Sequence, residues 1–182
     1  TSYRIKGGKV LIDGTAYDIS FLLPPAALAL WSGSGNYHHI NCLAYADGHW
    51  AAGGQYYDGA AYYGRIAYAA SLAGAWTVQD LWQGRDSTIK CLAYAEGYWV
   101  VGGMYGTGGS RNYARIAYAA GPAAAWTAKD IWYGGNRTVC VNELVYANGY
   151  WAAAGEAYSS TYYAYIAYAA KITGSWTVKE LW

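Results

Sequence analysis

The sequence predicts an all-β protein built from three tandem copies of a four-stranded unit. The first observation is a repeat of about fifty residues that several landmarks keep together. The second is the composition, with 22 Tyr, 10 Trp and 24 Gly in 182 residues. Tyr and Trp favour strands, and Gly favours tight turns. The clearest landmark is Ile-Ala-Tyr, which starts at Ile66, Ile116 and Ile166.

Each unit divides into four strand-like segments. The first segments are Ile40 to Ala46, Ile89 to Ala95 and Val141 to Ala147, and the second begin at Trp50, Trp99 and Trp151. The dipeptides between them are Asp47-Gly48, Glu96-Gly97 and Asn148-Gly149. Such pairs between apolar runs predict two-residue hairpin turns, because both turn positions need a positive φ. The third segment carries Ile-Ala-Tyr, and the fourth runs from Trp-Thr to Leu-Trp or Ile-Trp.

Four antiparallel strands in about fifty residues are typical of one blade of a β-propeller. A helical interpretation fails, because no segment sustains a 3.6-residue period. One blade cannot bury both of its own faces, so neighbouring blades must cover them. We therefore expect residues 32–182 to form three blades, at about 38–82, 88–132 and 139–182.

Residues 1–31 fit this pattern less well. Lys9 to Ile12, the turn Asp13-Gly14 and Thr15 to Ile19 predict a hairpin, and Leu30-Trp31 echoes the end of a blade. Two interpretations stay open. The segment is either a divergent first blade or a separate attachment hairpin, which would leave Leu28 to Trp31 as an outer strand.

The third turn of each unit carries a family resemblance. Tyr68 to Thr77 (YAASLAGAWT) resembles a degenerate Asp-box, the turn of bacterial neuraminidase-type propellers. The whole repeat is similar to those of bacterial secreted proteins and phage tail proteins. The acidic position of the box holds Ser71, Gly121 and Lys171. The resemblance implies the propeller fold and a virion or cell-surface location, and it adds nothing in favour of an activity.

Repeated tryptophans are expected to be structural. Those of the box-like turn should be buried and should anchor that turn, and those ending each unit should close the blade. The residues are Trp76, Trp126, Trp176, Trp82, Trp132 and Trp182.

Catalysis is not expected. Glycoside hydrolysis needs two suitably placed carboxyl groups or an equivalent nucleophile. Neuraminidase-like sites also hold the substrate carboxylate with an arginine cluster, and Tyr3-Arg4-Ile5 resembles only a fragment of one such motif. Asp80, Asp130 and Glu180 fall at one repeat position, which indicates a structural role because an active site is asymmetric. A sialidase-like glycoside hydrolase therefore ranks last among the functions considered.

Metal, nucleic-acid and membrane functions are also disfavoured. Adjacent strand residues such as His38 and His39 point to opposite faces and rarely share an ion, and no cofactor motif is present. Cys42 and Cys91 share one repeat position, so we expect them to remain unbridged. A net charge of +1 with 13% charged residues argues against nucleic acid. No apolar run of eighteen residues and no signal-peptide pattern is seen.

Variation between the units concentrates in two sets of loops, which should gather at one edge of the sheets. The loops between the second and third segments are expected at Gln55 to Gly64, Met104 to Ala114 and Glu156 to Ala164, and the loops that precede the first segments at Ser32 to Tyr37, Gln83 to Thr88 and Tyr133 to Thr138. We expect this edge to be a ligand-binding face, because tyrosine beside adaptable polar groups is typical of binding surfaces and suits sugar rings. The candidate residues are Tyr56, Tyr57, Tyr62, Tyr63, Arg85, Tyr105, Arg111, Asn112, Tyr113, Arg137, Tyr158, Tyr162 and Tyr163.

The expected function is a non-catalytic binding module for carbohydrate or cell-surface ligands, within a phage tail or bacterial surface assembly. The alternative is a purely structural assembly part whose tyrosines pack on each other. Three blades do not close a ring, so self-association or other assembly subunits are the expected partners, with glycans as candidate ligands.

Overall fold

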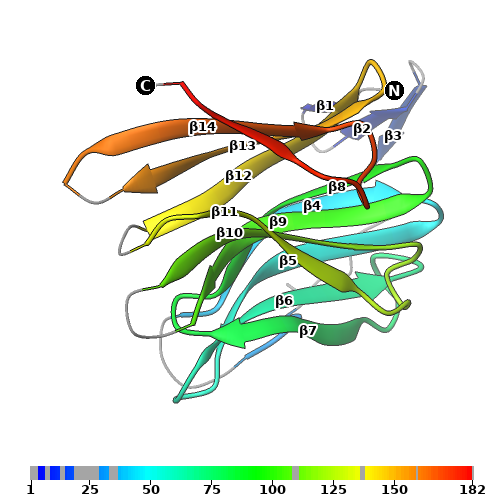
Figure 1. Ribbon diagram of the computed structural model, residues 1–182. Helices are drawn as coiled ribbons and strands as arrows, with labels where there is room; N and C mark the ends of the chain where they lie inside the picture. The colour runs from blue at the N-terminus through cyan, green and yellow to red at the C-terminus, as the bar shows by residue number, and fades with distance from the viewer. Residues whose placement is uncertain are drawn as a thin grey trace.

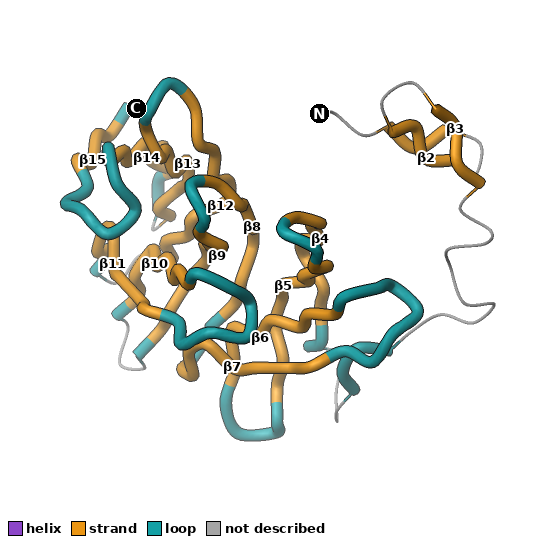
Figure 2. Tube along the Cα trace, turned by 90° about the vertical axis from the view of Figure 1, so that its right-hand side faces the viewer, coloured by secondary structure: helices purple, strands orange, loops and turns teal. Residues whose placement is uncertain are grey.

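The computed structural model describes residues 4–6, 9–12, 15–18, 29–32, 37–107, 111–135, 138–158 and 160–181. Every regular element in these ranges is a β-strand, and they contain no helix (Figure 2). Twelve of the strands form three four-stranded antiparallel sheets that follow one another along the chain (Figure 1). The predicted all-β class and the four-stranded unit are therefore confirmed.

Sheets I, II and III are simple antiparallel meanders, each running in chain order. Sheet I contains β4 (His39–Ala46), β5 (His49–Tyr57), β6 (Tyr62–Ala69) and β7 (Thr77–Gly84). Sheet II contains β8 (Thr88–Ala95), β9 (Tyr98–Gly106), β10 (Asn112–Ala119) and β11 (Thr127–Tyr133). Sheet III contains β12 (Thr138–Ala147), β13 (Tyr150–Tyr158), β14 (Tyr162–Ala169) and β15 (Thr177–Glu180).

The first hairpin of each sheet closes on the turn that its dipeptide predicts. Asp47 and Gly48 have φ values of 48° and 73°, and Glu96 and Gly97 have 52° and 75°. Both positions of each turn are therefore left-handed, which matches the right-handed twist of the flanking strands. The first strands also share a bulge, because the register with the second strand shifts at Asn41 and at the equivalent positions of the other two sheets. The three units thus repeat down to single residues.

The sheets stack face to face, and the core lies between them. Between sheets I and II, Ile66 and Trp82 from one side pack with Ile89, Trp99 and other apolar residues from the other side. A second cluster fills the space between sheets II and III. The sheets approach so closely that a Cβ atom built on Gly53 would lie 2.6 Å from Cγ2 of Ile89. The small residues of the second strands therefore allow the stacking.

Tryptophans tie each sheet to the next. Trp82, at the end of β7, is 5% exposed, and its Nε1 donates a hydrogen bond to the Met104 carbonyl oxygen of sheet II at 3.0 Å. Trp132 is 8% exposed and stacks on Tyr165 of sheet III with a centroid distance of 5.7 Å. The predicted structural role of both residues agrees with this packing, and Trp182 lies outside the described residues.

The tryptophans of the box-like turns are only half-buried, so the predicted full burial of Trp76, Trp126 and Trp176 is wrong. Trp126 and Trp176 pack against the two core clusters without entering them. Two of them form a hydrogen bond within their own turn. The Nε1 atoms of Trp76 and Trp126 donate to the carbonyl oxygens of Leu72 and Pro122, each at 3.3 Å.

The N-terminal segment forms a small three-stranded sheet in the order β1-β2-β3. Its strands are β1 (Arg4–Lys6), β2 (Lys9–Ile12) and β3 (Thr15–Asp18). The predicted pairing of Lys9–Ile12 with the strand that starts at Thr15 is therefore confirmed, while the predicted turn at Asp13-Gly14 lies outside the described residues. A search of the described part of the chain finds no helix that could cross a membrane.

Candidate functional site

Two sets of connections meet at one edge of the stacked sheets, which we call the tyrosine edge. It comprises the adjoining ends of β5 and β6, of β9 and β10, and of β13 and β14, together with the β7–β8 turn and the ends of β11 and β12 that face each other. A Cβ atom built on Gly84 would lie 2.0 Å from the Gly106 carbonyl oxygen, so the end of β7 touches the end of β9. The Gln55 Nε2 atom donates to the Ser87 carbonyl oxygen at 3.0 Å. Segments distant in sequence therefore share this edge.

The loops at this edge are shorter than the sequence predicts, because β5 extends to Tyr57 and β6 begins at Tyr62. Tyr57 pairs with Tyr62 across the hairpin, and Tyr56 pairs with Tyr63. The equivalent strand ends of sheet III behave alike, with Tyr158 opposite Tyr162. Most of the candidate tyrosines are therefore held by strand pairing.

An open hollow at the tyrosine edge brings three of the candidate residues together. This first hollow has a volume of about 660 Å³, within the range of small-molecule sites. Tyr57 and Tyr62 line one side, and Arg85 of the β7–β8 turn lines the other. The remaining lining residues are Ala60, Ala61, Gln83, Gly84, Asp86 and Thr107.

The two tyrosine rings that line this hollow form a cluster with a third ring. Tyr57 and Tyr62 face each other with ring centroids 4.6 Å apart. Tyr37 meets both rings edge-on, at 5.8 Å from Tyr57 and 5.7 Å from Tyr62. Loss of hydration and the two neighbouring rings raise the pKa of the Tyr62 hydroxyl. The cluster therefore presents a rigid apolar surface with hydroxyl groups at its rim.

Charged groups stand beside the rings. Arg85 and Asp86 are exposed, and neither forms an ion pair with any other described residue. Asp86 has a φ of 61°, which is uncommon for a residue other than glycine. The β7–β8 turn thus holds a guanidinium and a carboxylate side by side, where both are available to a polar ligand.

Asp58 fixes the β5–β6 loop, whose residues Ala60 and Ala61 line the first hollow. Its Oδ1 atom accepts hydrogen bonds from the backbone N–H groups of Ala60 and Ala61, both at 2.8 Å. Its Oδ2 atom accepts a hydrogen bond from the Tyr63 hydroxyl at 2.7 Å. Hydrogen bonds from the Ala61 backbone, from Tyr63 and from the Ala60 backbone lower the pKa of the Asp58 carboxyl from 3.8 to about 2.

A second hollow of about 390 Å³ lies on the other side of the β7–β8 turn, and Asp86 borders both. The first strands of all three sheets contribute to it, through His39, Thr88 and Thr138. Its remaining lining residues are Asn41, Gln55, Lys90 and Met104. The wall is polar and carries no aromatic ring besides the imidazole, so it is less suited than the first hollow to an apolar ligand face.

The rings of Tyr56 and Tyr105 each pack against the guanidinium group of an arginine. Arg65 lies 3.5 Å over the Tyr56 ring and forms a two-point ion pair with Asp80, at 2.6 and 2.9 Å. Arg115 repeats the arrangement on Tyr105 and Asp130. Burial is the largest single influence and lowers the pKa of the Arg65 guanidinium, but the hydrogen bonds and charge of Asp80, together with Tyr56, outweigh it and raise that pKa.

The third copy of this arrangement has lost its charge pair. Tyr165 replaces the arginine, and its hydroxyl donates to Glu180 at 2.6 Å. All three acidic residues at this repeat position are thus engaged by a partner on the neighbouring strand. This is the structural role that their repetition predicts.

The remaining candidates are distributed along the tyrosine edge rather than gathered in the first hollow. Tyr113 lies between Tyr105 and Tyr133 on sheet II, with centroid distances of 6.1 and 5.0 Å. Tyr158 and Tyr162 form an exposed pair on sheet III, 4.4 Å apart. Arg111 is exposed, and Asn112 and Tyr163 are half-buried, whereas Arg137 lies outside the described residues.

The cysteine thiols are unbridged and weakly acidic. Cys42, Cys91 and Cys140 are free, and burial raises the pKa of the Cys42 and Cys140 thiols to about 12. His38 and His39 are not joined by a third ligand, because the described residues contain no group of three His, Cys, Asp or Glu that could hold a metal ion.

Sequence reasoning missed three residues that shape the first hollow, namely Tyr37, Asp58 and Asp86. Asp86 stands next to Arg85 in a loop that varies between the units, and this was the available signal. Tyr37 ends one of the loops that vary between the units, but its ring contacts with Tyr57 and Tyr62 depend on the packing of a segment twenty residues upstream against a hairpin.

No protein-family model matches the chain, and comparison with curated proteins finds no similar sequence.

Proposed function

We propose that the chain is a non-catalytic binding module of the β-propeller type, which recognises carbohydrate on a cell surface through its tyrosine edge. The observation that carries this proposal is the first hollow, which the Tyr57 and Tyr62 rings line together with Arg85 and Asp86, while Tyr37 packs on both rings. Aromatic faces suit the C–H faces of sugar rings, and paired donors and acceptors suit their hydroxyl groups. A phage tail or a bacterial surface is the setting in which such a module would work.

The stacking of the sheets supports the propeller part of the proposal. The first strands β4, β8 and β12 pack in sequence, β4 against β8 and β8 against β12. Each sheet is a meander in chain order, and closing tryptophans from one sheet reach the next. Successive four-stranded meanders with adjacent inner strands are the arrangement of propeller blades.

A glycan array followed by titration calorimetry tests the proposed ligand class. We expect Tyr57→Ala and Arg85→Ala each to weaken binding at least tenfold, or about 1.4 kcal/mol. Val78→Ala on the outer strand β7 is the matched control, and it should bind as the unsubstituted chain does. Unchanged binding in the Tyr57→Ala and Arg85→Ala variants, with the fold intact, would show that the first hollow is not the site.

A purely structural role in an assembly is the second candidate. Ring contacts such as those between Tyr158 and Tyr162 show that some tyrosines pack on each other. If no glycan binds at any concentration and the chain captures only its assembly partners, this candidate replaces the first. Turnover of an aryl glycoside or sialoside that one carboxylate substitution abolishes would instead make the protein an enzyme.

A further inference from the structure

The two outer faces of the three-sheet stack expose apolar residues that are buried elsewhere in the repeat. On the free face of sheet I, Ile40 is 51% exposed and Leu43 is 56% exposed. Their equivalents lie against a preceding sheet, where Leu92 is half-buried and the other three are buried. Ile89 and Val141 are both 0% exposed, and Leu144 is 5% exposed. The free face of sheet I therefore has the composition of an interface that the chain builds twice internally.

Sheet III presents the opposite half of that interface. Ile166 is 38% exposed on its free face, whereas the equivalent Ile66 and Ile116 are both 0% exposed beneath the following sheet. Val145 and Leu181 are 52% and 44% exposed on sheet III. Apolar patches of this kind mark interaction surfaces. The free face of sheet III is therefore equivalent to the face of sheet I that packs on sheet II, and the free face of sheet I is equivalent to the face of sheet II that receives it.

We propose that two copies of the chain dock head to tail, with the free face of sheet III in one copy covering the free face of sheet I in the other. The inference rests on the propeller part of the proposed function. Two copies supply six sheets, which lies within the four to eight blades of closed propellers, whereas three copies would supply nine. A head-to-tail contact that closes on itself gives a two-fold ring and leaves no apolar face open.

A hydrogen-bonding clamp supports this arrangement. At the bulge of β4, Asn41 Nδ2 donates to the Ile89 carbonyl oxygen of sheet II at 2.7 Å and to Thr88 Oγ1 at 3.1 Å. Asn142 occupies the same bulge position on β12, at the free face of sheet III, and is exposed. Ile40 on sheet I is the equivalent of Ile89. Asn142 therefore repeats the clamp on Ile40 of the second copy.

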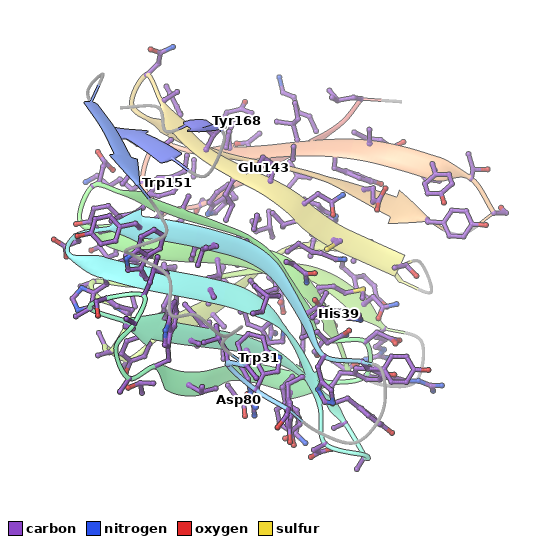
Figure 3. All side chains as sticks on the ribbon, turned by 180° about the vertical axis from the view of Figure 1, so that it is seen from behind. Trp31, His39, Asp80, Glu143, Trp151 and Tyr168 are labelled. Carbon is purple, nitrogen blue, oxygen red and sulfur yellow. The ribbon has the colours of Figure 1, made fainter. Side chains whose placement is uncertain are left out.

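Two features make this contact weaker than the internal ones. Glu143 and Ala154 of sheet III stand where sheets I and II have Cys and Gly, so the inner part of the face is bulkier and carries a carboxylate whose burial costs free energy. In addition, Trp31 Nε1 donates a hydrogen bond to the Gln55 carbonyl oxygen of sheet I. Trp82 makes the equivalent hydrogen bond on sheet II. Figure 3 labels both features, with Trp31 against sheet I and Glu143 on β12. The incoming outer strand must displace Trp31, so association should be reversible.

Sedimentation velocity across a concentration series tests the proposal. We expect a dimer whose dissociation constant rises at least about tenfold in Leu43→Arg and in Ile166→Arg, because each charge blocks one face. An equimolar mixture of the two variants should recover a dimer, since one intact contact remains between unlike copies. Ala124→Arg, in an exposed turn of sheet II, is the matched control and should dimerise normally.

Other outcomes overturn the proposal. A chain that stays monomeric throughout the series contradicts it, and so does a dimer that only Leu43→Arg disrupts, because that dimer would join two copies of sheet I. Reversion of the bulky positions gives a gain-of-association test. Glu143→Cys combined with Ala154→Gly should tighten the dimer, and a weaker dimer would refute the assigned face. Tyr57→Ala should leave the dimer unchanged, so a failure of the glycan proposal can be distinguished from a failure of the dimer proposal.

Discussion

The tryptophans of this protein differ in how deeply their side chains are buried. The more deeply buried ones should contribute more to the free energy of unfolding. Trp99 is 0% exposed between sheets I and II, whereas Trp76 covers one turn and remains half-exposed. Trp99→Ala should lower the free energy of unfolding by about 3–5 kcal/mol, as other aromatic deletions from cores do. Trp76→Ala should cost about 1–3 kcal/mol, because less packing is lost. Denaturant unfolding of both variants measures the difference, and equal losses would contradict this ranking.

The hydrogen bonds of the Asp58 carboxylate predict how stability depends on pH. Its carboxyl pKa is lowered to about 2 in the folded protein, chiefly by the hydrogen bond from the Ala61 backbone and then by the Tyr63 hydroxyl. A depressed pKa means that the contribution to stability is complete above the unfolded value of 3.8 and is lost as the pH falls toward 2. Carboxyl titration by NMR should place Asp58 near 2, and Tyr63→Phe should raise that value. A value near 4 in the unsubstituted protein would disprove the loop geometry.

At the scale of single elements, the left-handed hairpin turns make a matched pair of glycines informative. Gly97 has a φ of 75°, and its surroundings would leave room for a Cβ atom, so only backbone strain opposes a substitution. Gly97→Ala should therefore cost about 1–2 kcal/mol. Gly121 has equal space without the left-handed backbone, so Gly121→Ala should be neutral or stabilising by up to about 1 kcal/mol. Thermal unfolding of both variants compares them, and a harmless Gly97→Ala would refute the turn assignment.

The elements were largely predictable from the sequence, because their signals are local. Dipeptides such as Asp47-Gly48 specify a turn by backbone sterics alone, and the observed φ values agree. The loops were predicted too long at Tyr57 and Tyr62 because a Gly- and Tyr-rich stretch has the composition of a loop as well as of a strand end. Tyr is a strong strand former, and its cross-strand pairing decided the outcome.

The candidate site was predictable only in part. The sequence identified Tyr57, Tyr62 and Arg85, since they lie where the units differ, and the structure places all three around one hollow. It did not identify Tyr37 or the positive φ of Asp86, because both depend on how one segment packs against another. Variation between units thus marks the region, while the contacts within it arise from tertiary packing.

At the scale of the whole molecule, stability should be distributed like that of a short linear array. Sheet II has a neighbour on both sides, whereas sheets I and III each have one among the described residues. In such arrays each unit is stabilised by its own pairing and by nearest-neighbour interfaces. An end sheet should therefore open alone when its single interface is weakened.

Substitutions of two glycines can weaken the two interfaces of the stack separately and so test whether an end sheet opens alone. A Cβ atom on Gly102 would lie 2.7 Å from Cys91 Sγ and 2.7 Å from Val141 Cγ1, so Gly102→Val forces sheets II and III apart. A Cβ atom on Gly53 would lie 2.6 Å from Ile89 Cγ2, so Gly53→Val does the same to sheets I and II.

Native-state hydrogen exchange, at a concentration where the chain is monomeric, reads the result strand by strand. Gly102→Val should remove protection mainly from the β13 and β14 amides, because sheet III then loses the interface that holds it. Gly53→Val should remove protection mainly from β5 and β6 and leave β13 and β14 as they are. If either variant lowered protection equally in all three sheets, the stack would unfold as one cooperative body, and the array description would fail.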